Sequence, residues 1–343
     1  MPILTIIVPA YNADRYLHRA LSPFARALTG TDVEVIVVDD GSTDATATIA
    51  AEYAARYPTV FRVVTQANAG HGGAINAGIA AATGTYLKVL DADDWLDTDV
   101  LDRVVRTLEA LEPTGGVDAF FSDYVHERIG KENRTMRFES VFPSGRVFAW
   151  DESDRFGRRQ YLMMHAVIFR TSVVRASQLK LPEHTFYVDS LFVLIPLAHT
   201  RRLYYSPETL YHYFIGRPDQ SVDVDVMVRR VDQQLFVNRL ALKTLPPSDA
   251  VMTGEIPAAL YDCLLHYVEA LCAITSATLV HCGTPRHLVM RRSFWHEVRN
   301  DRPRVYRRMR RGLMGASSNL PGVAGRRVTL LAYGVARRVV GFS

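Results

Sequence analysis

The sequence predicts an α/β protein built on a mostly parallel central sheet and followed by a helical C-terminal region. Three observations predict this fold class. Short apolar runs alternate with helical patterns over the first hundred residues, these runs show no polar alternation, and the pattern is helical from residue 222 onward. Apolar runs without alternation are typical of parallel strands that are buried on both faces. We therefore expect helices on both faces of the sheet and right-handed crossovers.

The expected elements follow the chain in order. In the first hundred residues we expect strands at 4–8, 33–38, 61–65 and 86–90. The helical patterns between them cover 14–27, 43–57 and 72–82. Later helices are expected at 99–111, 171–178 and 190–199, and later strands at 119–128, 164–170 and within 202–213. A polar, irregular insertion occupies 131–159, and breaks at 246–247 and 283–285 interrupt the final helical region.

Length and charge indicate a chain of two differently charged parts. A chain of 343 residues supports roughly two domains at ~150 residues each. Residues 286–343 hold fourteen arginines and two acidic residues, a net charge of +12, so the rest of the chain carries −8. The three cysteines form no Cys-x-x-Cys pair, and we expect reduced thiols in a cytoplasmic protein. We expect no signal peptide and no run of ~20 apolar residues that could span a membrane.

Acidic residues follow two of the predicted strands directly. Asp39 and Asp40 follow the second strand, Asp91 and Asp93 follow the fourth, and residues 9–12 follow the first. Ligands of an open parallel sheet bind outside the carboxyl ends of its strands, so these segments should line one edge. Carboxylates gathered there repel one another unless a cation or hydrogen-bond donors compensate, and Mg²⁺ or Mn²⁺ prefers such oxygen ligands. The alternative is a solvated turn in which the acids cap helices.

Four segments share their order and spacing with a known family. Residues 5–12 (TIIVPAYN), 35–44 (VIVVDDGSTD), 68–78 (NAGHGGAINAG) and 87–94 (LKVLDADD) resemble family 2 glycosyltransferases. The resemblance is strong over 3–96 and weaker to about residue 225. It implies the GT-A fold and inversion at the anomeric carbon. It also implies a domain at 1–225, with a nucleotide-binding half (1–96) and an acceptor-binding half (97–225), before a helical region at 226–343.

The resemblance also implies roles for individual residues. It places these residues at the donor nucleotide: Pro9, Tyr11, Asp39, Asp40, Gly72, Asn76, Asp91 and Arg217. Asp93 is the expected principal ligand of Mn²⁺ or Mg²⁺, Asp91 shares in the metal shell, and Asp94 holds the turn. His212 is a further candidate ligand, with packing in a strand as the alternative. Arg217 is expected at the donor diphosphate because of its planar donor fork.

The expected general base is Asp189. The family places its base at the start of a helix after a short loop, and residues 181–192 occupy that place. Where the family often has Glu-Asp, this chain has Val188-Asp189. The alternative is that Asp189 only caps the following helix. His165 is expected to line the acceptor pocket or to pack in the core, and His71 departs from the small or polar residues usual in the glycine loop.

The arginine-rich end of the chain predicts a membrane contact. Residues 302–311 are densely cationic, and 328–342 combine apolar residues with arginines. A basic amphipathic segment of this kind is typical of a membrane-surface anchor. We therefore expect a peripheral protein at the inner face of the cell membrane, while a solvated helical face or a disordered end is the alternative. No nucleic acid is expected as a partner, because no recognisable nucleic-acid-binding module is present.

Together these observations predict an inverting glycosyltransferase. It would move a sugar from a nucleotide diphosphate donor, UDP being the carrier that the family uses most often, to a glycan, lipid-linked or polymer acceptor. A sugar-phosphate nucleotidyltransferase shares the sheet and the acidic edge, but it would need a glycine-rich, cationic loop after the first strand, where this chain has Pro9-Ala-Tyr-Asn. The non-enzymatic alternative is a catalytically silent scaffold that binds nucleotide sugars.

Overall fold

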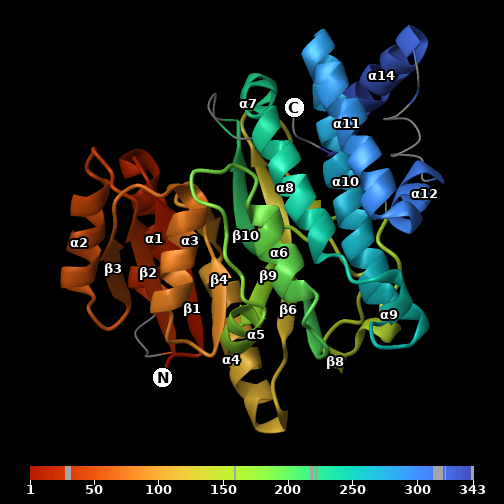
Figure 1. Cartoon of the computed structure of the whole chain (residues 1–343). Coiled ribbons are helices and arrows are strands. Elements are labelled where there is room, and N and C mark those ends of the chain that lie inside the picture. Colours follow the sequence, from red (N-terminus) through yellow and green to blue (C-terminus); the bar gives the residue numbers. More distant parts are fainter. Residues whose placement is uncertain are drawn as a thin grey trace. The chain divides into compact units, whose positions relative to one another are not determined.

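The computed structural model describes residues 1–27, 32–157, 160–216, 220, 223–311, 320 and 322–340 (Figure 1). The chain divides into two compact units. The first comprises Met1–Asp154 and Leu162–Ile215, and the second comprises Arg155–Tyr161 and Gly216–Ser343. The division lies at 215/216 where the sequence predicts 225/226, and a short piece of the polar insertion joins the second unit.

The first unit is built on one mixed sheet. Its strands are β1 (Leu4–Ala10), β2 (Val33–Asp39), β3 (Phe61–Thr65), β4 (Tyr86–Val89), β5 (Trp95–Leu96), β6 (Ala119–Arg128), β7 (Arg134–Met136), β8 (Val147–Phe148), β9 (Val167–Arg170) and β10 (Leu203–Ile215). The order is β3-β2-β1-β4-β9-β6-β10-β5, with β7 on β6 and β8 on β10. The pairs among β3, β2, β1 and β4 are parallel, β6 and β10 are parallel, and β9 runs antiparallel to both its neighbours. The predicted fold class is confirmed.

Helices connect and cover these strands. They are α1 (Asp14–Ala27), α2 (Thr46–Arg56), α3 (Gly70–Ala81), α4 (Thr98–Leu111), α5 (Thr171–Ala176) and α6 (Asp189–Leu197), with short 3₁₀ turns at Glu112–Thr114, Trp150–Glu152 and Met164–Ala166. Every residue of β1 and β2 is buried, as their unbroken apolar runs predict. A Cβ atom at Gly78 of α3 would lie 2.2 Å from Cγ2 of Ile7, so glycine lets this helix pack directly on β1.

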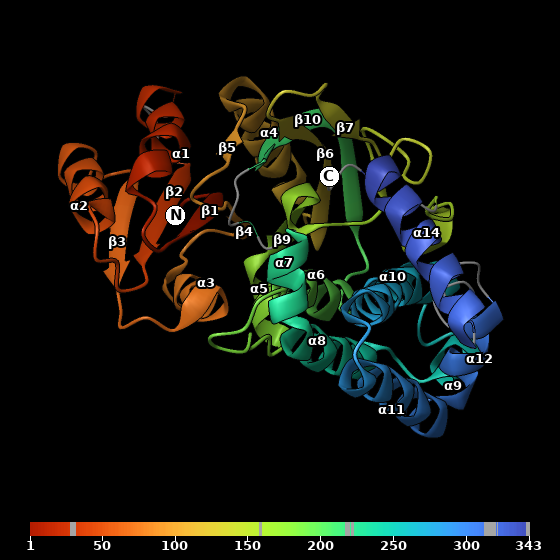
Figure 2. The same ribbon diagram turned by 90° about the horizontal axis from the view of Figure 1, so that it is seen from above.

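The second unit is helical. Its helices are α7 (Val224–Arg229), α8 (Val231–Thr244), α9 (Ser248–Met252), α10 (Ala258–Cys282), α11 (Pro285–Asp301), α12 (Pro303–Arg311) and α14 (Gly322–Val340). Figure 2 shows α10 among its neighbours, and it contacts α7, α8, α11 and α14. The predicted break at 283–285 is confirmed. Gly283 ends α10 with a φ of 67°, and Thr284 accepts a hydrogen bond from the His287 amide to begin α11.

Helix α10 corrects the expectation about apolar runs. Within the described part of the chain, it is the one helix with the length and composition of a membrane span. Its most apolar window is 72% buried inside the protein, which is typical of the core helix of a helical bundle.

The cationic run at 302–311 is a packed helix. Val305 and Met309 of α12 are buried. Arg308 donates to Asp262 Oδ1 at 2.6 Å, Arg304 pairs with Asp249, and Arg302 donates to the Leu245 carbonyl at 2.8 Å. Several arginines of this run therefore stabilise the second unit internally.

Candidate active site

The candidate site lies at the carboxyl edge of the parallel strands. Asp39 is the last residue of β2 and Asp91 follows β4 by two residues, while β1 lies between these strands. The loop after β1 is tied to the loop after β2. The Asn12 amide donates to Ser42 Oγ at 3.1 Å, and the Thr43 amide donates to Asn12 Oδ1 at 2.9 Å. The geometry therefore gathers the predicted segments at one edge of the sheet.

Two of the predicted base-contacting residues lie at this edge. Pro9 is buried within β1, whereas Tyr11 is 53% exposed just beyond the strand. A ring held on a rigid strand end with half its surface exposed is able to stack on a planar base. The contacts of Pro9 and Tyr11 with a nucleoside remain predictions.

Asp40 organises the loop between β3 and α3. The carboxylate is 2% exposed and accepts hydrogen bonds from Gln66 Nε2 at 2.7 Å and from the Ala69 and Gly70 amides at 2.8 Å each. Asp39 is equally buried, and its Oδ1 accepts from the Ser42 amide at 3.1 Å. These bonds give both aspartates a structural task, and their predicted donor contacts remain predictions.

Gly72 and Asn76 have a partner that the sequence did not indicate. Asn76 Nδ2 donates to the Leu181 carbonyl at 2.9 Å, and Asn76 Oδ1 accepts from the Leu181 amide at 3.0 Å. A Cβ atom at Gly72 would lie 2.5 Å from the Pro182 carbonyl oxygen. The structure packs both residues against residues 181–182, the start of the loop that leads to Asp189. Their predicted place beside the nucleotide remains a prediction.

The turn after β4 is held by Asp94. Its side chain is fully buried, with Oδ2 accepting from the Tyr211 hydroxyl at 2.6 Å and Oδ1 from the Phe214 amide at 2.8 Å. Burial and the neighbouring carboxylates Asp93 and Asp91 raise the pKa of Asp94 well above its usual range. Asp94 therefore fixes the turn that presents the other two aspartates, the task predicted for it.

His71 lies among the carboxylates of the site. Its Nε2 is 2.9 Å from Asp91 Oδ1, although its side chain is 38% exposed. Burial opposes protonation, but the hydrogen bond with Asp91 and the charges of Asp91, Asp189 and Asp93 together raise the pKa of His71. The raised pKa favours the protonated imidazole, whose positive charge offsets part of the negative charge of the carboxylates. The sequence signalled this residue only through its departure from the family pattern.

A group of possible metal ligands is formed by Asp91, Asp94 and His165. One ligand atom from each lies within 4.8 Å of the others. His165 is 4% exposed, and its Nε2 is 4.0 Å from Asp91 Oδ2. Its Nδ1 has no hydrogen-bond partner among the residues that the structure describes. Burial lowers the pKa of His165 to about 3, so the imidazole is neutral, as a ligand must be. Carboxylate oxygens suit Mn²⁺ and Mg²⁺, and a neutral imidazole nitrogen is a common further ligand, so Asp91 and His165 fit a divalent ion, while Asp94 is held by its hydrogen bonds to Tyr211 and Phe214.

The predicted ligands overlap this group in part. Asp91 belongs to it, whereas Asp93 lies outside it and acts on it through its charge. His212 pairs through Nδ1 with Glu127 Oε1 at 2.8 Å and stacks on Trp95 at 5.2 Å between centroids. Metal binding by Asp93 and His212 remains a prediction. His165 is expected at the acceptor pocket or in the core. Its ring centroid lies 4.5 Å from that of Tyr211 and 4.4 Å from that of Tyr213.

Asp189 begins α6, after the non-capping residue Val188. Burial raises the pKa of Asp189, the charge of His71 opposes this, and the charge of Asp91 adds to it. The expected base thus lies within electrostatic reach of the residues after β4. Arg217, predicted at the diphosphate, lies outside the described residues.

Lys88 is a fully buried lysine beside the site that was not among the residues predicted from the sequence. It lies in β4, is fully buried, and donates from Nζ to the His165 carbonyl at 2.7 Å. Burial lowers the pKa of Lys88 to about 7, while Asp91 works against this. A lysine inside the apolar run of β4 was the available signal, because lysine is rarely buried without a partner.

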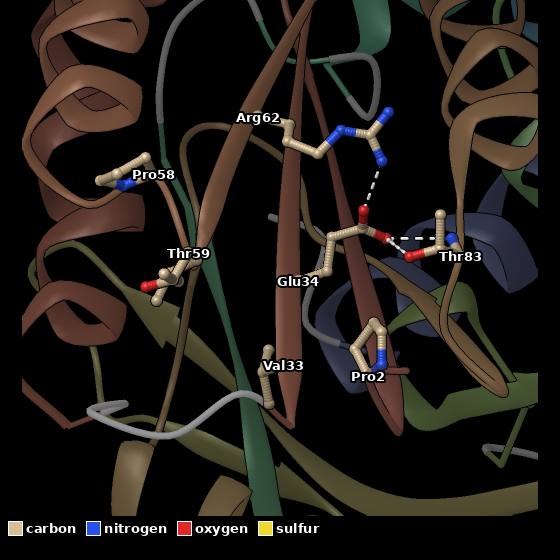
Figure 3. A pocket seen from close by; sticks show the side chains of 8 residues that line it. Pro2, Val33, Glu34, Pro58, Thr59, Arg62 and Thr83 are labelled. Atoms are coloured by element: carbon tan, nitrogen blue, oxygen red, sulfur yellow. Dashed lines mark hydrogen bonds and ion pairs between the residues drawn. The ribbon is translucent and has the colours of Figure 1, made fainter.

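A small pocket lies at the opposite ends of the strands (Figure 3). It is lined in part by Glu34, Arg62 and Thr83. Glu34 accepts from Thr5 Oγ1 at 2.8 Å, from the Thr83 amide at 3.0 Å and from Arg62 Nη1 at 2.5 Å. The network joins the starts of β1, β2 and β3 to the turn before β4, so we assign it to the stability of the sheet.

Comparisons with known proteins match this arrangement. A family model described as Glycosyl transferase family 2 matches residues 5–172. The curated relative named glycosyltransferase EpsH, of Bacillus subtilis (strain 168), is 27% identical over 257 residues, which cover 70% of this chain and 67% of EpsH. Other curated relatives are matched over smaller shares of their own length, such as 34% and 61%.

Solved structures share the fold. S. aureus TarS 1-349 in complex with UDP-GlcNAc superposes with a TM-score of 0.55 at 18% identity, covering 88% of this chain and 92% of that chain. The mannosyltransferase PcManGT from Pyrobaculum calidifontis, in complex with GDP-Man and Mn²⁺, gives a TM-score of 0.52 at 18% identity, covering 96% and 87%. The solved structures share the fold, and the sequence match shows that residues 5–172 are a glycosyl transferase family 2 domain, as the resemblance predicts.

Proposed function

We propose that this protein transfers a sugar, with inversion, from a nucleotide diphosphate sugar to a hydroxyl of a glycan or lipid-linked acceptor. One observation carries the proposal. The pair Asp91 and His165, which suits a divalent ion, lies at the carboxyl edge of the sheet within electrostatic reach of Asp189. A diphosphate leaving group and a base are the two requirements of such a transfer, and this edge offers a place for each.

The comparisons support the nature of the donor. The structural neighbours carry UDP-GlcNAc in one case and GDP-Man with Mn²⁺ in the other. We propose a pyrimidine or purine nucleoside diphosphate sugar as donor, with UDP as the first carrier to test.

In the proposed reaction, the acceptor oxygen forms a bond to the anomeric carbon while the bond from that carbon to the diphosphate oxygen breaks. Asp189 accepts the proton of the acceptor hydroxyl. Asp91 would hold a divalent ion together with His165, and Asp93 is proposed as a further ligand. When bound, such an ion would neutralise the negative charge that develops on the leaving diphosphate. His71 keeps Asp91 oriented through its 2.9 Å contact.

A discriminating experiment compares products and binding. We expect UDP or GDP to bind more tightly with Mn²⁺ than without it in calorimetry, and a panel of nucleotide sugars to yield a nucleoside diphosphate during turnover. Release of pyrophosphate from a nucleoside triphosphate and a sugar phosphate would identify the nucleotidyltransferase alternative. Binding without turnover of any donor and acceptor pair would favour the scaffold. If neither diphosphate binds in the presence of metal, the proposal fails.

We further propose that the second unit binds the inner face of the cell membrane from the cytoplasm. Among the side chains of α14 that the structure describes, Val323, Val328 and Leu331 are apolar and exposed, at 59%, 45% and 71%. Arg326 and Arg327 lie in the same turns, half-buried and exposed respectively, and the α12 residues Arg307 and Arg311 are exposed. Apolar residues flanked by arginines suit an interface of acyl chains and anionic headgroups. A lipid-linked acceptor would be presented at that surface.

Vesicle co-sedimentation tests this membrane contact. Each basic residue near an anionic surface contributes about 1 kcal/mol, so replacing Arg326 and Arg327 by alanine should weaken binding by about 2 kcal/mol, or ~30-fold. The matched control replaces the exposed arginines Arg15 and Arg106 of the first unit and should bind as the wild type does. Equal binding to neutral and phosphatidylserine-rich vesicles would contradict the proposal.

A further inference from the structure

The loop that carries the proposed base is fastened to α3. Asn76 makes two hydrogen bonds to the Leu181 backbone, at 2.9 and 3.0 Å. Three residues along the loop, the His184 amide donates to the Ala69 carbonyl at 2.8 Å, just before α3 begins. The loop is therefore held along the face of one helix at two separate points.

Glycine makes this close approach possible. A Cβ atom at Gly72 would lie 2.5 Å from the Pro182 carbonyl oxygen, and one at Gly70 would lie 2.8 Å from the His184 nitrogen. Contacts below 3.0 Å to backbone atoms cannot be relieved by turning a side chain. The spacing of the glycines thus fits the path of the loop, which gives the glycine-rich start of α3 a reason that needs no nucleotide.

The same helix start is anchored to the donor side. The Asp40 carboxylate accepts from the Ala69 and Gly70 amides at 2.8 Å each. The Ala69 peptide therefore lies between two partners, with its amide on Asp40 and its carbonyl on His184. A continuous set of hydrogen bonds runs from the end of β2 to the loop before Asp189.

The loop needs such support because its backbone is strained. His184 and Tyr187 have φ angles of 49° and 68°, in the left-handed region that side chains other than glycine rarely occupy. Residues of this kind keep their conformation only where the surrounding structure holds them. Tyr187 is two residues before Asp189, so relaxation there would move the carboxylate.

We propose that Asn76 and Gly72 are positioning residues that hold the loop at 181–188 so that Asp189 meets the acceptor hydroxyl beside the donor. This inference rests on the proposed function, and it replaces the donor contacts predicted for these two residues with a task on the acceptor side. The hydrogen bonds of Asn76 fix the backbone of Leu181, and the loop that begins at Leu181 in turn fixes the position of Asp189.

Steady-state kinetics and calorimetry on Asn76→Ala test the proposal. Loss of both hydrogen bonds frees the loop, and a misplacement of about 1 Å at a reacting group can cost ~100-fold in rate. We expect kcat to fall by ~100-fold while the dissociation constant of the nucleoside diphosphate with Mn²⁺ changes less than about twofold. Asn76→Asp keeps the acceptor for the Leu181 amide and should recover part of the rate. Gly72→Ala, which pushes on Pro182, should reproduce the loss in kcat.

A matched control separates positioning from stability. Asn238 is a buried asparagine of α8 that donates to Thr275 Oγ1 at 2.8 Å, so Asn238→Ala removes a comparable hydrogen bond away from the site. It should lower the melting temperature while leaving kcat unchanged. A lower nucleotide affinity with unchanged kcat in Asn76→Ala would overturn the inference and restore the donor contact. If Asp189→Asn retains full turnover, the proposed base is wrong, whatever Asn76→Ala does.

Discussion

Replacement of Asp189 by asparagine is expected to lower kcat by ~10²- to 10⁴-fold, the range that a positioned general base contributes. Asparagine has nearly the same shape but cannot accept the proton of the acceptor hydroxyl. Donor affinity should remain close to the wild-type value, because the proposed donor contacts lie after β1, β2 and β4. The measurement is steady-state turnover with the best donor from the screen, beside calorimetric titration of its nucleoside diphosphate with Mn²⁺.

The pH profile gives a second readout for Asp189. Burial raises the pKa of this carboxyl above its ordinary value of 3.8, the charge of His71 lowers it, and that of Asp91 raises it. A base must be unprotonated, so the wild-type kcat should fall as the pH drops through this raised pKa. The residual rate of the variant should lack that decline.

Asp99→Asn is the matched control for Asp189→Asn. Asp99 lies in the first turn of α4, the position that Asp189 has in α6, but Asp99 is exposed and far less buried than Asp189. Both substitutions remove a negative charge from a helix N-terminus. Such a charge stabilises the helix by about 0.3–1 kcal/mol, so both variants lose a comparable amount of helix stability. A role limited to the helix would make the two variants equally active, and that result would remove Asp189 from the chemistry.

The parallel half of the fold was predictable because its signals are local. β1 and β2 are wholly buried, and their unbroken apolar runs predict this burial from the sequence alone. The position of Asp39 and Asp91 at one edge then followed from the rule that parallel strands end together. The direction of β9, which runs antiparallel between β4 and β6, could not be predicted in this way. The sequence of a four-residue apolar strand does not indicate whether the strand is parallel or antiparallel to its neighbours.

The less predictable part of the site depends on residues that are distant in sequence. Asn76 and Leu181 are 105 positions apart, and nothing in either segment indicates the hydrogen bonds between them. The resemblance placed Asn76 near the nucleotide because it follows the glycine loop. His165 is brought to Asp91 by the 3₁₀ turn before β9, where the sequence predicts a continuous strand. Such contacts are set by tertiary packing, which periodicity does not report.

The second large effect is expected at Asp93. Removing groups that only orient metal ligands usually costs 10- to 100-fold in metal affinity, so loss of a direct carboxylate ligand in Asp93→Asn should cost at least ~100-fold. We expect the Mn²⁺-dependent part of nucleoside diphosphate binding to disappear in calorimetry, while the melting temperature without metal stays constant or rises, because one carboxylate fewer repels Asp91 and Asp94.

Asp97→Asn is the matched control, since it removes one negative charge from the same segment and leaves the metal group intact. Asp97 caps α4 by accepting from the Val100 amide at 2.9 Å, and asparagine caps helices equally well. This variant should bind nucleotide with Mn²⁺ as the wild type does. In the structure, Asp91, Asp94 and His165 form the group of possible ligands without Asp93. This arrangement shows which result would contradict the prediction that Asp93 is a ligand. If Asp93→Asn keeps metal-dependent binding while Asp91→Asn and His165→Ala lose it, the ion is held by the deeper group, and Asp93 acts on the site only through its charge.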